Sequence, residues 1–297
     1  MMAAFTLAHL SDPHLAPLPR PRLAELAGKR ALGYLNWTRN RYKYHRRDIL
    51  DLLVSDLHTQ MPDQIAVTGD LVNFALESEF PLAQAWLKTV GPPDKVTAIP
   101  GNHDAYVRST RLRFAESFAA YFGGDAPQEG PATFPSLRRR GPLALISLSS
   151  AVPSGPFMAT GRLGSAQLAA LEQLLQSIAH EQLFRVLLVH HPLRSANRMK
   201  RLTDAKDLIA LLARHGVELI LHGHDHVHST IWIDGPERKI PTVGVPSASS
   251  IAHGHYPAAA YNIFAISRAG NHWRCDMTVR SVNDALRVRE IRQVRLL

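Results

Sequence analysis

The chain has 297 residues, of which 45% are hydrophobic and 20% are charged, and these proportions are ordinary for a globular protein. Its net charge of +9 favours anionic partners, such as phosphoesters, nucleic acids or acidic lipid surfaces. The single cysteine, Cys275, excludes an intrachain disulfide, and no apolar run approaches the roughly 20 residues that span a bilayer. Because residues 1–10 also lack the features of a secretory leader, we expect a cytoplasmic protein.

Apolar runs alternate with amphipathic stretches along the first two thirds of the chain. The runs predict strands at Phe5–Leu10, Gln64–Thr68, Lys95–Ile99, Leu143–Leu148, Phe184–Val189 and Val217–Leu221. Helical periodicity predicts helices at Arg47–His58, Glu77–Val90, Val107–Phe122, Ser165–Ala179 and Thr203–Arg214. Further strands are expected at Thr230–Ile233, Pro241–Val245, Tyr261–Ser267 and Trp273–Val279. This order predicts two packed, partly parallel sheets flanked by helices, with Gly123–Pro142 as an exposed excursion.

A basic and aromatic segment interrupts this alternation near the amino terminus. Between Lys29 and Arg47, seven cations occur without an acidic residue, and four aromatic residues are interleaved with them. We expect an insertion at about 20–47 within a single domain of residues 1–297. Residues 28–47 could form a structural helix with a solvated face, a lid over a substrate, or a patch on an anionic membrane surface. No recognised motif supports specific nucleic-acid binding.

Five short segments each end a hydrophobic run in residue types that bind metals. They are Asp12-Pro13-His14, Gly69-Asp70, Gly101-Asn102-His103-Asp104, His190-His191-Pro192 and Gly223-His224-Asp225-His226. Each segment has an ordinary explanation by itself, such as a helix-capping aspartate, a turn or a surface histidine cluster. Together, at the carboxyl ends of strands, they can deliver two carboxylates, an amide and several imidazoles to one sheet edge. That set suits two divalent cations that share a carboxylate, and it predicts a binuclear metallohydrolase.

In this order the segments resemble the calcineurin-like metallophosphoesterases, from about Phe5 to about His226. The resemblance implies an α/β fold, a four-layer α-β-β-α sandwich with two mixed sheets and the metals at one edge. It implies a first metal on Asp12, His14, Asp70 and His226, and a second on Asp70, Asn102, His190 and His224. Because the chain lacks both a thiolate ligand and the tyrosine that purple acid phosphatases have at the position of Asn73, we expect Mn, Fe, Co or Zn.

The resemblance also implies a mechanism and a substrate class. A hydroxide that bridges the metals would attack phosphorus, while His103, oriented by Asp104, would protonate the leaving group. Gly-Asp-Leu-Val-Asn and Gly-Asn-His-Asp closely match class III cyclic-nucleotide phosphodiesterases, so we expect a phosphodiesterase for a small phosphoester, with a cyclic nucleotide as a candidate. We expect substrate contacts from Asn73, His191 and His255.

Two alternatives remain at the level of sequence. The long insertion departs from a minimal phosphodiesterase and favours a diphosphatase, similar to UDP-2,3-diacylglucosamine hydrolases, that acts on a UDP-sugar lipid at the inner face of the membrane. A non-catalytic metal-binding scaffold is the alternative from another functional class. The His103–Asp104 pair argues against the scaffold, because a scaffold has no need of an acid.

Overall fold

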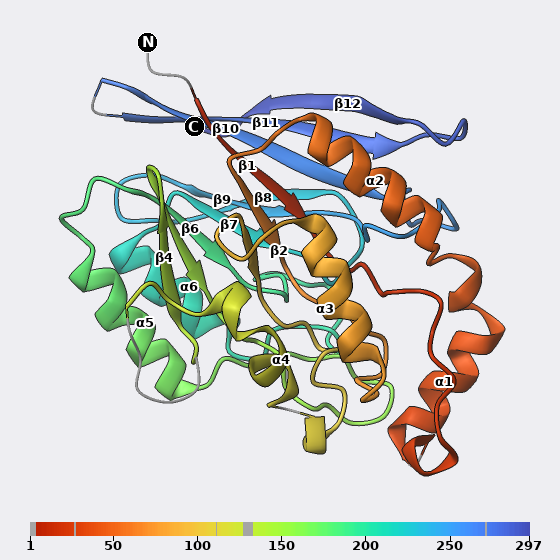
Figure 1. Ribbon diagram of the computed structural model, residues 1–297. Coiled ribbons are helices and arrows are strands. Elements are labelled where there is room, and N and C mark those ends of the chain that lie inside the picture. The colour runs from red at the N-terminus through yellow and green to blue at the C-terminus, as the bar shows by residue number, and fades with distance from the viewer. Residues whose placement is uncertain (1–3, 27, 111, 127–132, 271) are drawn as a thin grey trace.

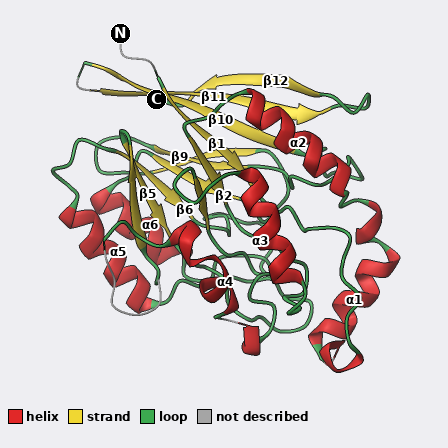
Figure 2. Cartoon of the chain, viewed as in Figure 1, coloured by secondary structure: helices red, strands yellow, loops and turns green. Residues whose placement is uncertain are grey.

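The computed structural model describes residues 4–26, 28–110, 112–126, 133–270 and 272–297, and two six-stranded mixed sheets dominate it (Figures 1 and 2). The first sheet has the strand order β12-β11-β10-β1-β2-β3. Its strands are β1 (Phe5–Leu10), β2 (Gln64–Val67), β3 (Val96–Ala98), β10 (Ala260–Ala269), β11 (His272–Val282) and β12 (Val288–Arg295). Strands β1, β2 and β3 are parallel, whereas β10 pairs with β1 in the antiparallel direction.

The second sheet has the strand order β4-β5-β6-β7-β9-β8. Its strands are β4 (Ser136–Arg140), β5 (Leu143–Ser147), β6 (Phe184–Leu188), β7 (Leu219–His222), β8 (Ser229–Ile233) and β9 (Ile240–Gly244). Strands β5, β6, β7 and β9 are parallel, and the two edge strands are antiparallel to their neighbours. The predicted two mixed sheets are therefore confirmed.

The layers follow from the alternation of side chains along each strand. Leu7 packs with the second sheet in the core between the sheets, whereas Ala8 and Leu10 join the core on the opposite face of the first sheet. That outer core includes α2 (Arg47–Thr59), α3 (Glu79–Val90) and α4 (Arg113–Phe122). On the outer face of the second sheet lie α5 (Ser165–Ser177) and α6 (Ala205–His215). The order of layers is thus α-β-β-α, as expected.

Part of the expected excursion at 123–142 is a strand instead. Ser136–Arg140 forms β4 at the edge of the second sheet, in register with β5. Three consecutive arginines suggest a loop, but Arg138 is buried, and its guanidinium donates to the carbonyl oxygens of Val96 and Tyr121. Residues 127–132 of the excursion lie outside the described residues.

The basic–aromatic segment forms helix α1 (Lys29–Arg39) and a short 3₁₀ turn, η2 (Arg41–Lys43), which leads into α2 (Figure 1). Trp37 is the buried residue of α1 and packs edge-to-face against Phe74. Arg30 donates to the carbonyl oxygens of Phe74 and Ala75, in the loop after β2. Within the described residues, no helix combines the length and hydropathy that crossing a membrane requires.

Candidate metal centre

The five predicted segments meet at the carboxyl ends of β1, β2, β3, β6 and β7. Backbone hydrogen bonds hold neighbouring loops together: the amide of Asp12 donates to the carbonyl of Gly69, and the amide of His14 to that of Asp70. Across the two sheets, the amide of His224 donates to the carboxylate of Asp12 at 3.0 Å. Since parallel strands end at the same edge, each ligand-bearing loop begins close to the next.

The side chains of the seven predicted ligands converge at this edge. Asp12 Oδ1 lies 3.1 Å from His226 Nε2, which in turn lies 3.3 Å from His14 Nε2. Asp70 Oδ2 lies 3.7 Å from His14 Nε2 and 3.4 Å from His190 Nε2. Asn102 Oδ1 lies 3.2 Å from His190 Nε2, and His224 groups with Asp70 and His190.

Three groups of metal-binding atoms occur among the described residues, and Asp70 belongs to two of them. These two are His14, Asp70 and His103, and Asp70, His190 and His224; the third is His14, His45 and His226. In each group the ligand atoms lie within 4.8 Å of one another. A carboxylate that belongs to two groups can bridge two cations, which a single imidazole cannot do. The bridging role of Asp70 stays a prediction, and His103, the expected acid, falls in one of the two groups that contain Asp70.

The hydrogen bonds and charges of these residues fit bound cations. His190 Nδ1 lies 2.6 Å from the carbonyl of Thr68, so a proton on Nδ1 leaves the Nε2 lone pair free for a metal. His224 Nε2 is buried and has no hydrogen-bond partner among the described residues, as expected for an atom reserved for an ion. Burial lowers the pKa of His190, but the carboxylates of Asp70 and Asp12 outweigh burial and raise it to about 10. Buried carboxylates are stable only with positive charge nearby, which a protonated imidazole or a bound cation can supply.

The local backbone is strained where the ligands lie. Asp12, His14, Asp70, His224 and His226 all have positive φ angles, between 39° and 72°, which non-glycine residues seldom adopt. Such conformations cost of order 1 kcal/mol or more each and occur at functional sites where the surrounding structure enforces them. Two glycines let the loops approach this closely. A side chain on Gly101 would collide with Asp70, and one on Gly223 would collide with Ser11 and Asp12.

His103 faces the same edge, but Asp104 does not orient it. His103 Nδ1 lies 2.5 Å from the carbonyl oxygen of Asn73, and His103 Nε2 lies 3.3 Å from Arg41 Nη1. The fully buried carboxylate of Asp104 instead accepts the backbone amides of Gly101, at 2.8 Å, and Val72, at 3.1 Å. The expected orientation of His103 by Asp104 is therefore wrong: Asp104 ties two ligand loops together, and a backbone carbonyl orients the imidazole.

The three residues expected to contact substrate have other surroundings. Asn73 is fully buried, and its amide donates to the carbonyl of Leu15. His191 is also buried, with its ring nitrogens at Ser150 Oγ and the carbonyl of Ala159. His255 is exposed and stacks on Tyr256. From that loop, Tyr256 and His253 line the cavity at the metal centre.

Two residues of the basic–aromatic segment enter the centre, and motif reasoning missed both. Arg41 Nη2 lies 3.1 Å from His14 Nε2 and 3.4 Å from His45 Nε2. His45 is buried and stacks parallel to Trp37, with its Nδ1 atom 3.0 Å from Ser249 Oγ. The local sequence gives no strand-end signal for either residue. Their only sequence signal is a run of cations and aromatics that lacks acidic partners.

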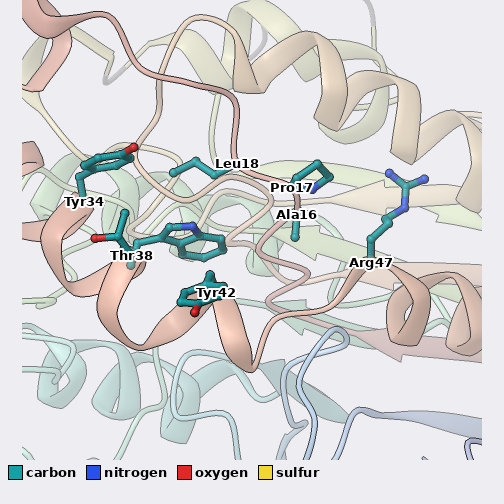
Figure 3. A pocket seen from close by; sticks show the side chains of 8 residues that line it. Ala16, Pro17, Leu18, Tyr34, Thr38, Tyr42 and Arg47 are labelled. Atoms are coloured by element: carbon teal, nitrogen blue, oxygen red, sulfur yellow. The ribbon is translucent and has the colours of Figure 1, made fainter.

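Cavities lie on both sides of α1. One of about 360 Å³ opens over the metal centre and is lined by Arg41, His45, Asp70, His103 and Tyr256 among others. A groove of about 560 Å³ lies away from the ligands, on the outer side of the segment, where Leu18 and Pro17 face Thr38 and Tyr42 (Figure 3). The chemistry belongs to the first cavity, because it contains the candidate ligands and His103.

Comparisons with known proteins support the family and the fold. The sequence profile of the family described as calcineurin-like phosphoesterase matches residues 5–228. No curated protein sequence matches the chain. A dimetal phosphatase from Danio rerio is 14% identical, with a TM-score of 0.58 and 99% of each chain covered. A purple acid phosphatase from yellow lupin is also 14% identical, with a TM-score of 0.62, covering 98% of this chain and 53% of that one.

The fold alone does not fix an activity. The protein described as the GAP50 anchor in the inner membrane complex of Plasmodium is 12% identical and has a TM-score of 0.54, covering 99% of this chain and 89% of that one. Family membership therefore rests on the profile match over residues 5–228, joined by the buried histidine and aspartate clusters at the sheet edge. On that evidence the chain belongs to the calcineurin-like phosphoesterase family.

Proposed function

We propose that the protein is a binuclear metal-dependent phosphodiesterase in which His103 is the general acid. One observation carries this proposal: His103 lines the same cavity as Asp70, the carboxylate common to two groups of metal-binding atoms. A phosphoryl group held at Asp70 would place its leaving oxygen within reach of the imidazole. A scaffold would need the metal ligands but no acid beside them.

The ligands divide into two sets that share Asp70. Asp12, His14, Asp70 and His226 would hold the first ion, and Asp70, Asn102, His190 and His224 the second. When bound, two divalent ions such as Mn, Fe, Co or Zn supply Lewis acidity to the phosphoryl oxygens and lower the pKa of water at the site. The remaining steps depend on residues of the chain itself.

The surroundings of His103 suit proton donation toward the cavity. The carbonyl of Asn73 accepts the Nδ1 proton and fixes the ring plane, and Nε2 of the neutral ring accepts from Arg41. Nε2 would donate to a leaving oxygen once the ring is protonated. Burial lowers the pKa of His103 to about 4; Asp70 opposes this shift and Arg41 reinforces it. A bound phosphodiester anion would favour the protonated imidazole.

Arg41 supplies positive charge on the same side. Burial lowers the pKa of its guanidinium, whereas Asp70 and Asp12 raise it. If two divalent ions neutralise these carboxylates, the buried guanidinium of Arg41 needs another negative charge, and an anion in the cavity would supply it. We therefore assign Arg41 to the non-bridging phosphoryl oxygens, beside the ester oxygen that His103 would protonate.

Two classes of substrate are candidates. The match of Gly69–Asn73 and of Gly-Asn-His-Asp to class III cyclic-nucleotide phosphodiesterases supports a small phosphodiester, with a cyclic nucleotide as one candidate. A diphosphatase on a UDP-sugar lipid, at an anionic membrane surface, is the second candidate. The position of α1 favours the second, because Arg41 and His45 of this insertion lie at the metal centre. A minimal phosphodiesterase would lack an insertion beside its metal centre.

A panel of substrates with metal-reconstituted protein tests the proposal. It should include a nitrophenyl diester, cyclic nucleotides in both ring forms and a UDP-linked lipid. His103→Ala should retain metal but lose roughly 10²–10⁴-fold in rate on esters with poor leaving groups, and less on nitrophenyl esters, whose leaving groups need little protonation. His255→Ala is the matched control, because this exposed histidine lies outside the cavity lining. Equal losses on both kinds of ester would refute the acid role, and no turnover by any metallated form would favour a scaffold.

A further inference from the structure

A second cavity begins at His103 and extends away from the metal ligands. It measures about 490 Å³ and is bordered by α1 on one side and by residues 156–159 on the other. Arg41, Asn102 and His103 form its inner end, and Lys29 and Phe157 belong to its outer part. His103 lines both this cavity and the one over the metal centre, so if it is the general acid, as proposed above, this cavity is open to the leaving group of the substrate. The side chains that line the cavity therefore indicate the chemistry of the leaving group.

Lys29 contributes a cation to this cavity. Its Nζ atom donates to Ser154 Oγ at 2.9 Å and to the carbonyl of Met158 at 3.1 Å, and it lies 4.6 Å from the centre of the Tyr106 ring. Burial lowers the pKa of this ammonium group, and the carboxylate of Asp70 opposes the shift. The ammonium group has three N–H donors, of which two bond to neutral acceptors. One donor and the positive charge therefore remain available to an anion.

Tyr106 links Lys29 to the acid. The rings of His103 and Tyr106 lie 5.5 Å apart, and Lys29 lies beyond Tyr106. An anion at Lys29 would thus lie next to the aromatic ring that contacts His103, on the side of the proposed acid.

Close packing fixes the position of α1 over this cavity. A side chain on Gly33 would meet the ring of Phe74 at 2.8 Å and would also collide with the hydroxyl of Tyr106. Glycine is therefore required in the middle of this helix, although glycine is a poor helix former. Together with the hydrogen bonds from Arg30 to the loop after β2, this contact sets Lys29 and Arg41 on the same side as the metal ligands.

The outer wall is apolar and open to solvent. Phe157 is 81% exposed, Leu32 46% and Met158 39%, and all three line the cavity. Exposed apolar side chains around a cavity that also holds cations favour a ligand with an apolar or aromatic body. Phe157 also has a positive φ of 61°, a conformation that bulky residues seldom adopt.

We propose that this cavity is the leaving-group subsite, and that it takes a leaving group which carries an anionic substituent, held by Lys29, on an apolar or aromatic body packed against Phe157 and Met158. The hydrolysed bond is the one between phosphorus and the ester oxygen of this group. Water supplies the new oxygen on phosphorus, and the proton of His103 passes to the departing oxygen. Lys29 takes no part in proton transfer; it determines specificity.

A matched pair of esters tests this assignment. Methyl 4-ethylphenyl phosphate and methyl 4-(phosphonomethyl)phenyl phosphate have leaving phenols of similar acidity, and they differ in the anionic substituent. For metal-loaded wild type, kcat/KM should favour the phosphonate ester by about tenfold or more, the scale of one charge-assisted hydrogen bond. Lys29→Met should remove most of this preference, and Lys29→Arg should keep it. Lys43→Met, an exposed lysine on the adjacent turn, should leave the ratio unchanged.

A binding measurement separates this proposal from the proposed reaction. Calorimetry with 4-(phosphonomethyl)phenol, the free leaving group, should show binding to the wild type that Lys29→Met weakens about tenfold and Lys43→Met does not. If the phenol binds in this way but neither ester is hydrolysed, the subsite stands and the proposed reaction fails. If Lys29→Met lowers kcat/KM for both esters equally, or leaves binding of the phenol unchanged, Lys29 only supports the 154–158 loop and the subsite is refuted.

Discussion

Replacing Glu79 tests how the loop after β2 is held, and with it the orientation of His103. Glu79 is the first residue of α3 and is almost completely buried. Its carboxylate accepts the backbone amides of Asn73 at 2.7 Å, Phe74 at 3.0 Å and Leu76 at 2.9 Å. The carbonyl of Asn73, in turn, accepts the hydrogen bond from His103. One buried side chain therefore fixes the loop on which the proposed acid depends.

The magnitude follows from the three amides. Glu79→Ala leaves three buried N–H groups without their acceptor, and each such group costs about 1–3 kcal/mol. Because water can enter the space left by the side chain and solvate some of them, we expect a loss of roughly 3–5 kcal/mol in the free energy of unfolding. Glu79→Gln keeps one acceptor oxygen and should lose about 1–2 kcal/mol. The expected order of stability is wild type, then Glu79→Gln, then Glu79→Ala.

Urea unfolding of the metal-free proteins measures these differences, with Glu77 as the control. Glu77 lies two residues away, is 60% exposed, and forms surface ion pairs with Arg22 at 3.4 Å and Arg113 at 2.9 Å. Surface pairs of this kind contribute about 0–1 kcal/mol, so Glu77→Gln should lie close to wild type. The same variants should be assayed on esters with good and poor leaving groups. If the Asn73 carbonyl is held less firmly, the rate should fall more for the ester with the poor leaving group, as it should after loss of His103.

Two results would refute this reasoning. If Glu79→Ala and wild type unfold with free energies within about 0.5 kcal/mol, the three hydrogen bonds do not hold the loop. If Glu79→Ala is strongly destabilised but keeps the wild-type ratio of rates on good and poor leaving groups, Asn73 does not control His103. In the second case the ring would be held by its other contact, with Arg41.

Three further predictions concern other parts of the molecule. Asp70→Ala should lose both metals, as measured by elemental analysis, because Asp70 belongs to two ligand groups; two retained ions would refute the bridge. Burial raises the pKa of Asp56, but hydrogen bonds from Arg280 and Tyr261 outweigh burial and lower it below 3.8. Its stabilisation is therefore present above about pH 4 and lost as pH falls through the folded-state pKa, so Asp56→Asn should flatten the acid side of a urea-midpoint profile. If α1 contacts an anionic membrane, replacing the exposed Arg39 and Lys43 should weaken vesicle binding about 30-fold, at about 1 kcal/mol per cation; wild type that ignores anionic vesicles at low salt would refute membrane contact.

The fold was predictable where burial dictates the pattern. Ten expected strands are present, because fully buried parallel strands such as β6 are continuous apolar runs that leave few alternatives. The two strands missed, β4 and β12, are edge strands rich in charged residues. In β12 most side chains are exposed, and edge strands commonly carry charges. Their strand character comes from pairing with a neighbour, which a local pattern does not show.

The candidate ligands were predictable for a different reason. Each follows a strand, and the carboxyl ends of parallel strands share an edge, so position in the sequence implied position in space. Orientation within the site was not predictable in the same way. Asp104 adjoins His103 in sequence, yet its carboxylate turns to the amides of Val72 and Gly101. Hydrogen bonding to backbone groups decides such details, and those groups are supplied by loops distant in sequence.

The residues that we propose to face the substrate could not be predicted from strand ends. Lys29 and Arg41 follow no strand, and their places depend on how α1 packs: on Gly33 against Phe74 and on Trp37 against His45. These contacts join segments that no periodicity relates. In our proposal the chemistry depends on the sheet edge, whereas specificity depends on the insertion. A family that shares the ligand segments can for this reason differ in substrate, and the composition of the insertion, with its cations beside apolar side chains, is where the substrate of this protein is to be sought.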